Sequence, residues 1–510
     1  MILFSKYFGQ TRARLVQAGA ALVAGVLVAG CGSAYRSVVT PITPSGPAAQ
    51  PQSFAAVVSA PSPTTAGIAT IIDYAGDTVM AESPIGPGPF AFTVDQGGAT
   101  GYTINSDGTL TNFQISTSLQ AKNLEFTTLP GTAQPVNLFS PSGGLWIADL
   151  NANVVDALTG YPESFKYAIP VGINPVTIVG PSTLGQRDYA ISQNFDAPSG
   201  TATNGVACNI APTAAPVTGV ATPIETASYT TDTPIPVGKC PVYAVSSLDD
   251  KRFFVLNRGD DTITVINSQN NTLDTCSGLV SQSGRQVTCH PTLPLSLNAV
   301  AATGITPPNG TSGMTQTAGP VYAEYNLATS QLVVANYDGG TISVIDVSLD
   351  EYGNDSATFG TTYTIPVGNN PASVTVLYDG SRAYTANQAD STVSIVTLSS
   401  HTVEKTLTVT GHPRTVVSTQ NSTYGKVYVA SPDSPYLTII QTGGSDPDIV
   451  DTSILVEGNI VDVRVSTQNG SGGNTNSVSR VPGHGEPCYL PPSQLATDNT
   501  LTLAACSKLP

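Results

Sequence analysis

The chain has 510 residues and a formal net charge of −16, and only 11% of its residues are charged. This acidity argues against nucleic acid and anionic lipid headgroups as partners, because both need a basic surface. The 48 glycines and 39 prolines, with abundant Thr, Ser, Val and Asn, are typical of a turn-rich all-β protein. We therefore expect one large all-β domain that does not bind nucleic acid.

The first thirty residues have the three parts of a secretory signal. A basic start with Lys6, Arg12 and Arg14 precedes an apolar stretch over 15–28. That stretch of about fourteen residues is shorter than the roughly 20 that a membrane-spanning helix needs. We therefore expect residues 1–30 to be a signal peptide that is removed on export.

The signal ends on the segment 27–31, Leu-Val-Ala-Gly-Cys, which resembles the lipobox of bacterial lipoproteins. The resemblance implies that Cys31 becomes the mature N-terminus and carries diacylglycerol and an acyl chain such as palmitate. Several acyl chains on one residue anchor a protein stably. Gly32 stands where an Asp would indicate retention in the inner membrane, so the outer membrane is favoured, on its periplasmic or its surface face. The alternative is an ordinary signal peptide that is cleaved nearby.

The next segment, 31–53, is rich in Pro, Ser and Ala and poor in bulky apolar residues. Such a composition cannot build a core and is typical of a tether. We expect the tether to hold a folded domain, 54–467, away from the lipid surface. A tail over 468–510 follows, and it begins with a stretch rich in Gly and Asn.

One pattern recurs through the domain at a spacing of about 40 residues. Its clearest copy begins at Pro371, alternates apolar residues up to Leu377, turns at Asp379-Gly380 and ends in a fourth strand over 402–409. The turns, rich in Gly, Asn and Asp, supply the backbone conformations that tight hairpins need. Each repeat is therefore predicted to be a unit of four antiparallel strands.

The repeat also carries a signature, which is complete over 334–371. It reads Val-Ala-Asn, then Asp-x-x-Thr-Ile-Ser-Val-Ile-Asp, then Ile-Pro-Val-Gly-x-x-Pro. This signature resembles the YVTN β-propeller repeat, a relative of WD40-like propellers in bacterial and archaeal surface and envelope proteins. The resemblance covers most of residues 67–466 and implies a single β-propeller of four-stranded blades.

Prolines or equivalent residues mark seven blade starts. These lie near Pro89, Pro135, Pro175, Pro241, Pro320, Pro371 and Pro413. An eighth start near Gly458 opens one strand, 461–465, whereas the strands over 68–73 and 78–82 lack a first strand. We predict that the C-terminal strand completes the N-terminal blade, because closing the ring removes open sheet edges. Eight blades are favoured over the seven that are commoner in the family.

Setting Cys31 aside leaves six cysteines in an exported chain, an even number that predicts three disulfides. They are Cys208, Cys240, Cys276, Cys289, Cys488 and Cys506. The expected strand order places the first two on one face of the ring and the middle two together on the other, and the last two would close a loop in the tail. Six cysteines allow fifteen connectivities, so these three pairs are a geometric preference.

Loops between second and third strands place polar residues on one face of the ring. The candidate binding residues there are Asp149, Arg258, Asp260, Asp261, Tyr337, Asp338 and Asp390. Their carboxylates are suited to a cation or a sugar, and Arg and Tyr side chains dominate the energy of many contacts. The alternative is that the Asp residues serve turn geometry alone.

No catalytic residue is assigned, because the chain has no Gly-x-Ser-x-Gly elbow and its histidines are scattered. We expect no cofactor and leave a metal open. The prediction is a monomeric, non-enzymatic binding or scaffold module for an envelope protein, a peptide or a glycan, which contacts the membrane through its lipid anchor only.

Two long insertions, 196–216 and 275–318, would add contact surface to such a module. The alternative function, implied by similar propellers, is a lactonase-like hydrolase with a metal in the central channel. A quinone-dependent dehydrogenase has less support, because such propellers carry a tryptophan in each blade and Trp146 is the only one here.

Overall fold

A computed structural model describes most of the predicted domain. The described residues are 54–465 without 63, 75, 96–99, 115–124, 129–133, 141–143, 151, 161–162, 181–186, 195–217, 248–250, 277–286, 296–317 and 420. The predicted signal peptide, the tether, the tail and the first insertion lie outside these residues, as do most of the second insertion and Cys31, Cys208, Cys488 and Cys506. Among the described residues, no helix is long and apolar enough to cross a membrane.

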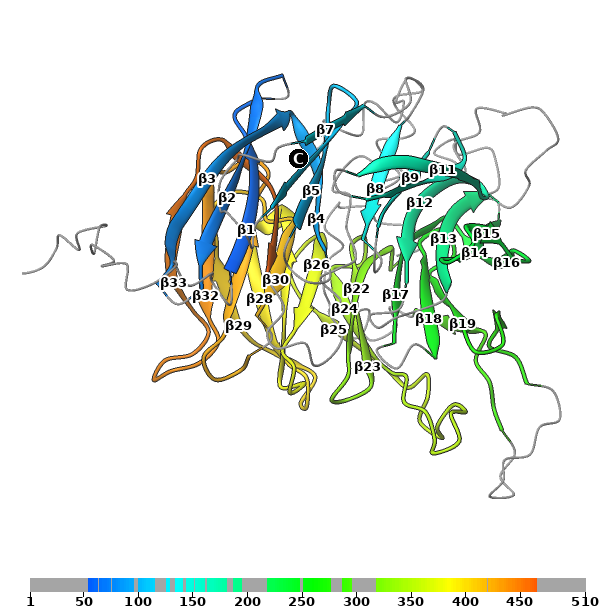
Figure 1. Cartoon of the computed structure of the whole chain (residues 1–510). Helices are drawn as coiled ribbons and strands as arrows, with labels where there is room; N and C mark the ends of the chain where they lie inside the picture. Colours follow the sequence, from blue (N-terminus) through cyan, green and yellow to red (C-terminus); the bar gives the residue numbers. More distant parts are fainter. Residues whose placement is uncertain are drawn as a thin grey trace, which may run out of the picture. The chain divides into compact units, whose positions relative to one another are not determined.

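The described strands form eight antiparallel sheets (Figure 1). The first blade contains β1 (Phe54–Ala60), β2 (Ala66–Asp73), β3 (Thr78–Pro87) and β34 (Asn459–Val465). The second contains β4 (Pro89–Val94), β5 (Thr100–Asn105), β6 (Thr109–Gln114) and β7 (Glu125–Thr128). The third contains β8 (Pro135–Phe139), β9 (Leu145–Asp149), β10 (Val154–Thr159) and β11 (Ser164–Pro170). The fourth contains β12 (Ile173–Val179), β13 (Arg187–Asn194), β14 (Thr218–Glu225), β15 (Thr230–Thr231) and β16 (Ile235–Lys239).

The remaining blades follow the same order. The fifth contains β17 (Pro241–Ser246), β18 (Arg252–Asn257), β19 (Thr262–Asn267), β20 (Thr272–Leu273) and β21 (Thr292–Pro294). The sixth contains β22 (Pro320–Asn326), β23 (Gln331–Asn336), β24 (Thr341–Asp346) and β25 (Thr362–Pro366). The seventh contains β26 (Pro371–Val376), β27 (Arg382–Asn387), β28 (Thr392–Thr397) and β29 (Thr402–Thr408), with the 3-10 helix η2 (Gln388–Asp390). The eighth contains β30 (Thr415–Ser418), β31 (Lys426–Ala430), β32 (Tyr436–Gln441) and β33 (Ile449–Leu455).

The chain closes into an eight-bladed β-propeller, as predicted. Strand β34 pairs with β1, with Val463 opposite Val57, so the last strand is the first strand of the first blade. First strands of successive blades contact one another around the ring, and β34 contacts β4 to complete it. The second strand of this blade, β1, is one that the repeat pattern did not mark. The ring therefore leaves no open edge at its closure.

Two blades have an interrupted fourth strand. Both β15 and β16 pair with β14, and both β20 and β21 pair with β19. In the fifth blade the interruption holds the disulfide between Cys276 and Cys289, whose Cα atoms lie 5.6 Å apart. This predicted pair is confirmed. Cys240 is also disulfide-bonded.

A buried asparagine explains much of the repeat signature. In the seventh blade Asn387 ends the second strand, and its Nδ2 donates to the hydroxyls of Thr392 and Ser394 at 3.0 and 2.9 Å. Asn105, Asn257 and Asn336 make the same pair of bonds in their blades. A Cβ added to Gly368, which enters the seventh blade, would lie 2.6 Å from Asn387 Cγ. The glycine of Ile-Pro-Val-Gly therefore makes room for the asparagine of the next blade.

Candidate functional site

The predicted binding residues lie in the loops between second and third strands, which we call the rim. Asp149, Asp260 and Asp390 each accept a hydrogen bond from a backbone N–H in the link that enters their own blade, at 2.9, 3.0 and 2.6 Å. Asp261 accepts the N–H of Gly319 in the next blade at 2.8 Å, and burial raises the pKa of Asp261. These four carboxylates hold backbone segments together, which is the structural role weighed for them above.

The other three rim candidates contact one another. Arg258 donates to Asp338 through Nε at 3.1 Å and through Nη2 at 2.6 Å, and its guanidinium lies 5.3 Å from the ring centroid of Tyr337. The Tyr337 hydroxyl donates to Gln388 Oε1 at 3.0 Å. The Arg258 side chain is only 4% exposed. This group therefore links the fifth, sixth and seventh blades.

The third blade departs from the asparagine pattern. Asp149 stands where four other blades have their buried asparagine, and Asp156 stands where those blades have a Thr or Ser six or seven residues later. Asp156 is 2% exposed. Burial raises the pKa of Asp156 to about 6, and the nearby charge of Asp149 acts in the same direction. In the third blade, two carboxyl groups therefore lie close together where the repeat otherwise forms a hydrogen bond from an asparagine to a Thr or Ser hydroxyl.

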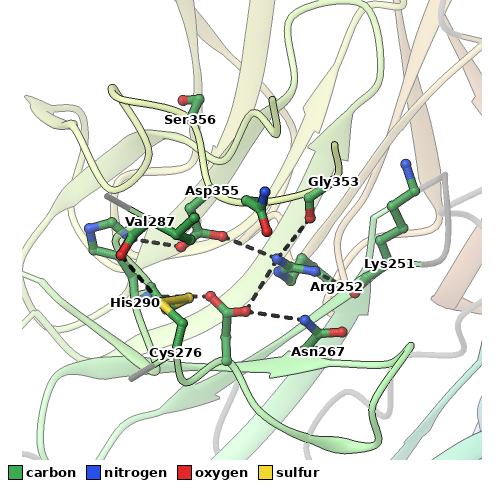
Figure 2. Close-up of polar contacts among 12 residues, drawn as sticks. Lys251, Arg252, Asn267, Cys276, Val287, His290, Gly353, Asp355 and Ser356 are labelled. Carbon is green, nitrogen blue, oxygen red and sulfur yellow. Dashed lines mark hydrogen bonds and ion pairs between the residues drawn. A yellow bond between two sulfur atoms is a disulfide. The ribbon is translucent and has the colours of Figure 1, made fainter. Parts of the chain in front are cut away.

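Sequence reasoning missed a buried charge network between the fifth and sixth blades (Figure 2). Arg252 begins β18, and its Nη2 lies 3.2 Å from Asp274 Oδ1 and 3.2 Å from Asp355 Oδ1. Asp274 follows β20, whereas Asp355 lies in the excursion between β24 and β25. All three side chains are at most 2% exposed. Backbone carbonyls of Lys251 and Gly353 accept further bonds from the guanidinium.

His290 completes this network. Its Nδ1 lies 2.7 Å from Asp355 Oδ2, and its backbone N–H donates to Asp274 Oδ2 at 3.3 Å. Burial raises the pKa of Asp355 to about 6, although the contact with His290 opposes this shift. Cys289 immediately precedes His290, so the disulfide restrains the histidine beside its partners (Figure 2). The fifth and sixth blades are thus joined by the side chains of Arg252, Asp355 and His290, with Asp274 as a second carboxylate.

A different surface lies along the fourth strands. The ring of Tyr167 in β11 contacts that of Tyr229 in the next blade at a tilt of 37°, with ring centroids 4.9 Å apart, and the ring centroids of Trp146 and Tyr229 are 6.2 Å apart. Lys166 Nζ lies 4.6 Å from the Tyr229 ring centroid and 3.5 Å from its hydroxyl oxygen. Phe165 and Tyr167 are 50% and 49% exposed. An aromatic cluster with one ammonium group therefore faces outward at this seam.

A second aromatic pair occurs at the seam between the sixth and seventh blades. The rings of Tyr363 and His401 are stacked with centroids 3.7 Å apart and an interplanar angle of 12°. Tyr363 is 46% exposed, and burial lowers the pKa of His401. Each pair joins an exposed tyrosine of a fourth strand to an aromatic residue in the next blade's hairpin between third and fourth strands. No group of three or more metal-binding side chains occurs within the described part of the chain.

Comparison with known proteins extends to the fold only. No protein-family model and no curated protein matches the chain. It is similar to the solved structure of apo AztD from Citrobacter koseri, with 12% identity, 81% of this chain and 97% of that chain covered, and a TM-score of 0.51. A second Citrobacter koseri AztD structure gives 13% identity, coverages of 83% and 98%, and a TM-score of 0.51. A putative 6-phosphogluconolactonase from Bacteroides fragilis gives 13% identity, coverages of 82% and 99%, and a TM-score of 0.47. At these identities, the similarity to the two AztD structures supports the fold alone and assigns no activity.

Proposed function

We propose that this chain is a YVTN-type β-propeller, anchored through Cys31 to the outer membrane, that acts as a non-enzymatic binding module of the cell envelope. The lipobox-like segment and the tether composition support the anchor. The closed, helix-poor ring supports a rigid scaffold. Its binding surface is the outer circumference, by which we mean the fourth strands β3, β11, β25, β29 and β33 together with the hairpin residues Tyr229 and His401 that contact them.

The distribution of exposed apolar side chains carries this proposal. Of the thirteen large hydrophobic residues that are exposed in the described structure, eight lie on the outer circumference. They are Val79, Met80, Phe165, Tyr167, Tyr363, Val403, Val450 and Leu455. None of the thirteen lies within a described loop of the rim, and Tyr436 begins β32 directly beside one. These eight residues lie on the outermost strands of five blades and supply exposed apolar area for an interaction site, whereas Arg258, Tyr337 and Asp338 of the rim contact one another.

Fractionation tests the anchor. The full chain, expressed in a Gram-negative host, is expected in the outer-membrane fraction, and the Cys31→Ser variant in the soluble periplasmic fraction, because the variant lacks the acylated thiol. Mass spectrometry of the N-terminal peptide should find diacylglycerol and acyl chains on the wild-type protein only. A wild-type protein that is soluble and unacylated would disprove the anchor.

Cosedimentation tests the binding role separately. The soluble Cys31→Ser protein is mixed with purified cell envelopes of the source organism and centrifuged. We expect saturable cosedimentation that does not depend on the lipid. A protein that stays in the supernatant at every concentration would contradict a binding module.

A further inference from the structure

We propose that the two aromatic pairs of the outer circumference, Tyr167–Tyr229 and Tyr363–His401, are stacking sites for an uncharged glycan chain. This inference rests on the proposed binding function and names its ligand class. It depends on three observations, which are the backbone conformation of Tyr229 and His401, the exposure of their partner rings, and the charge of the surroundings.

The backbone conformation is unfavourable for an aromatic residue. In five hairpins between third and fourth strands, one residue other than glycine has a positive φ. These residues are Asp77, Tyr229, Asn271, His401 and Asp448, with φ of 50°, 59°, 54°, 56° and 61°. Asn, Asp and His are enriched in this left-handed region, whereas a bulky side chain such as Tyr is an outlier there. Strain of this kind persists where the surroundings enforce it, and it gathers at ligand-binding sites. Tyr229 thus retains an aromatic ring where Asn would fit with less strain, and His401 places a second ring at the same hairpin position.

A hydrogen bond between blades at this hairpin position does not require a ring. At this hairpin position Asn271 accepts a hydrogen bond from the hydroxyl of Tyr189 in the preceding blade, at 3.0 Å. Asp448 accepts one from Tyr384 in the same way. Those tyrosine rings are buried, with Tyr189 and Tyr384 both 0% exposed. A small polar residue therefore suffices to link two blades at this point, and it does so without an exposed ring.

The partner rings of the two aromatic pairs remain in contact with solvent. Tyr167 and Tyr363 are 49% and 46% exposed although each contacts an aromatic ring of the next blade. Aromatic faces carry partial negative charge and attract the polarised C–H groups on the apolar face of a sugar ring. The hydroxyl of Tyr229 and the ammonium group of Lys166, 3.5 Å apart, lie beside the first pair and can bond sugar hydroxyls. The first site therefore offers both a stacking face and polar groups.

The charge and the size of the sites favour a neutral glycan over other ligands. The net charge of −16 opposes polyanions, including acidic polysaccharides. Each site consists of a few rings, whereas a stable protein interface buries about 800 Å² on each partner. Sugar rings in a chain are small enough to stack one at a time. Because the two sites lie on different seams of one rigid ring, a polymer that reached both would gain avidity.

Affinity electrophoresis tests this inference. Soluble Cys31→Ser protein is run in native gels that contain glycol chitin, mixed-linkage β-glucan, xyloglucan or dextran as neutral polymers, or polygalacturonate as an acidic one. We expect retardation in at least one neutral gel. We also expect Tyr167→Ala and Tyr229→Asn to weaken that retardation at least tenfold, and His401→Asn to weaken it less if the first site dominates. Retardation in none of the neutral gels, or in polygalacturonate alone, would overturn the inference.

An exposure-matched control separates binding from folding. Tyr378, 52% exposed in the turn between β26 and β27, belongs to neither pair, so Tyr378→Ala should leave retardation unchanged. Thermal unfolding of Tyr229→Asn should match wild type within a few degrees, because relief of the backbone strain offsets the lost stacking. Equal losses in all three tyrosine variants would refute the two sites. If envelopes still bind every variant as wild type does, the glycan sites fail while the binding function stands.

Discussion

The rim and the outer circumference both carry side chains that are typical of binding sites, and they use them differently. On the rim, Arg258, Tyr337 and Asp338 bond to one another, and the Arg258 side chain is 4% exposed. On the outer circumference, Tyr167 is 49% exposed although it contacts the Tyr229 ring. Residue type and position on a face are therefore insufficient to identify a binding surface. What matters is whether the side chains keep exposed surface after they have made their contacts within the chain.

The largest loss of stability should come from a substitution at Gly368, whose backbone lies close to the buried side chain of Asn387. In Gly368→Ala the new Cβ would lie 2.6 Å from Asn387 Cγ, and Asn387 is fully buried. We expect a loss of about 3 kcal/mol in the free energy of unfolding, because a packed core yields little to an added methyl group. Urea denaturation measures it. In the control Gly76→Ala the nearest atom lies at an ordinary 3.4 Å, and an equal loss there would contradict the account.

The free energy of unfolding should depend on pH because Asp149 and Asp156 lie close together in the third blade. Burial raises the pKa of Asp156 to about 6, so the folded state holds a proton that the unfolded state releases near its ordinary pKa. The stability that this proton contributes is present at low pH and is lost as the pH rises through 6. Asp156→Ser, which restores the usual residue type, should therefore be more stable than wild type by about 2 kcal/mol at pH 7.

The same comparison at low pH tests the sign of this effect. Below the unfolded-state pKa both forms of the wild-type chain hold the proton, so the advantage of Asp156→Ser should disappear near pH 4. Denaturant titrations at pH 4, 5, 6 and 7 follow the change. An advantage that stayed constant over this range would show that packing, and not protonation, distinguishes the two proteins.

A moderate loss of stability is expected when Arg258 on the rim is replaced. Arg258→Ala removes the two hydrogen bonds to Asp338, whose side chain is 35% exposed and can be rehydrated. We expect a loss of about 1 to 2 kcal/mol in unfolding free energy. Arg258→Lys should recover part of this, because lysine keeps the charge but lacks the planar fork. Envelope binding should not change in either variant.

The smallest effect on stability is expected on the outer circumference. Tyr229→Asn loses stacking on Tyr167 but relieves a positive φ of 59°. These contributions are each about 1 kcal/mol and opposite in sign. Differential scanning calorimetry should therefore find a nearly unchanged protein. A loss as large as that of Gly368→Ala would mean that the aromatic pair is a structural element like the rim.

The fold could be predicted because its signals are local. Ile-Pro-Val-Gly occurs at 169–172, 235–238 and 365–368, and a buried asparagine ends the second strand of four blades. The contact of Asn387 with Gly368 explains why the two features occur together. Strand β1 escaped notice because its sequence, Phe-Ala-Ala-Val-Val-Ser-Ala, lacks the signature. The pairing of Cys276 with Cys289 was also accessible, since 13 residues separate them.

The sites could not be predicted to the same extent, because their contacts are distant in sequence. Arg252 and Asp355 are 103 residues apart and belong to different blades. Tyr167 and Tyr229 also meet across a seam, and no residue type marks either as exposed. The residues in the hairpin turns did carry a signal for the aromatic pairs. Tyr229 and His401 occupy hairpin positions where the same turn elsewhere holds Asn or Asp, and that exception points to them.

Cosedimentation with purified envelopes tests most directly that the outer circumference, and not the rim, binds the partner. Soluble Cys31→Ser protein is compared with two further versions of it, one carrying Arg258→Ala and Tyr337→Ala on the rim and one carrying Tyr167→Ala and Tyr229→Asn on the outer circumference. The account predicts that the rim version binds like its parent and that the circumference version binds at least tenfold more weakly. Loss of binding in the rim version, with full binding in the circumference version, would contradict it.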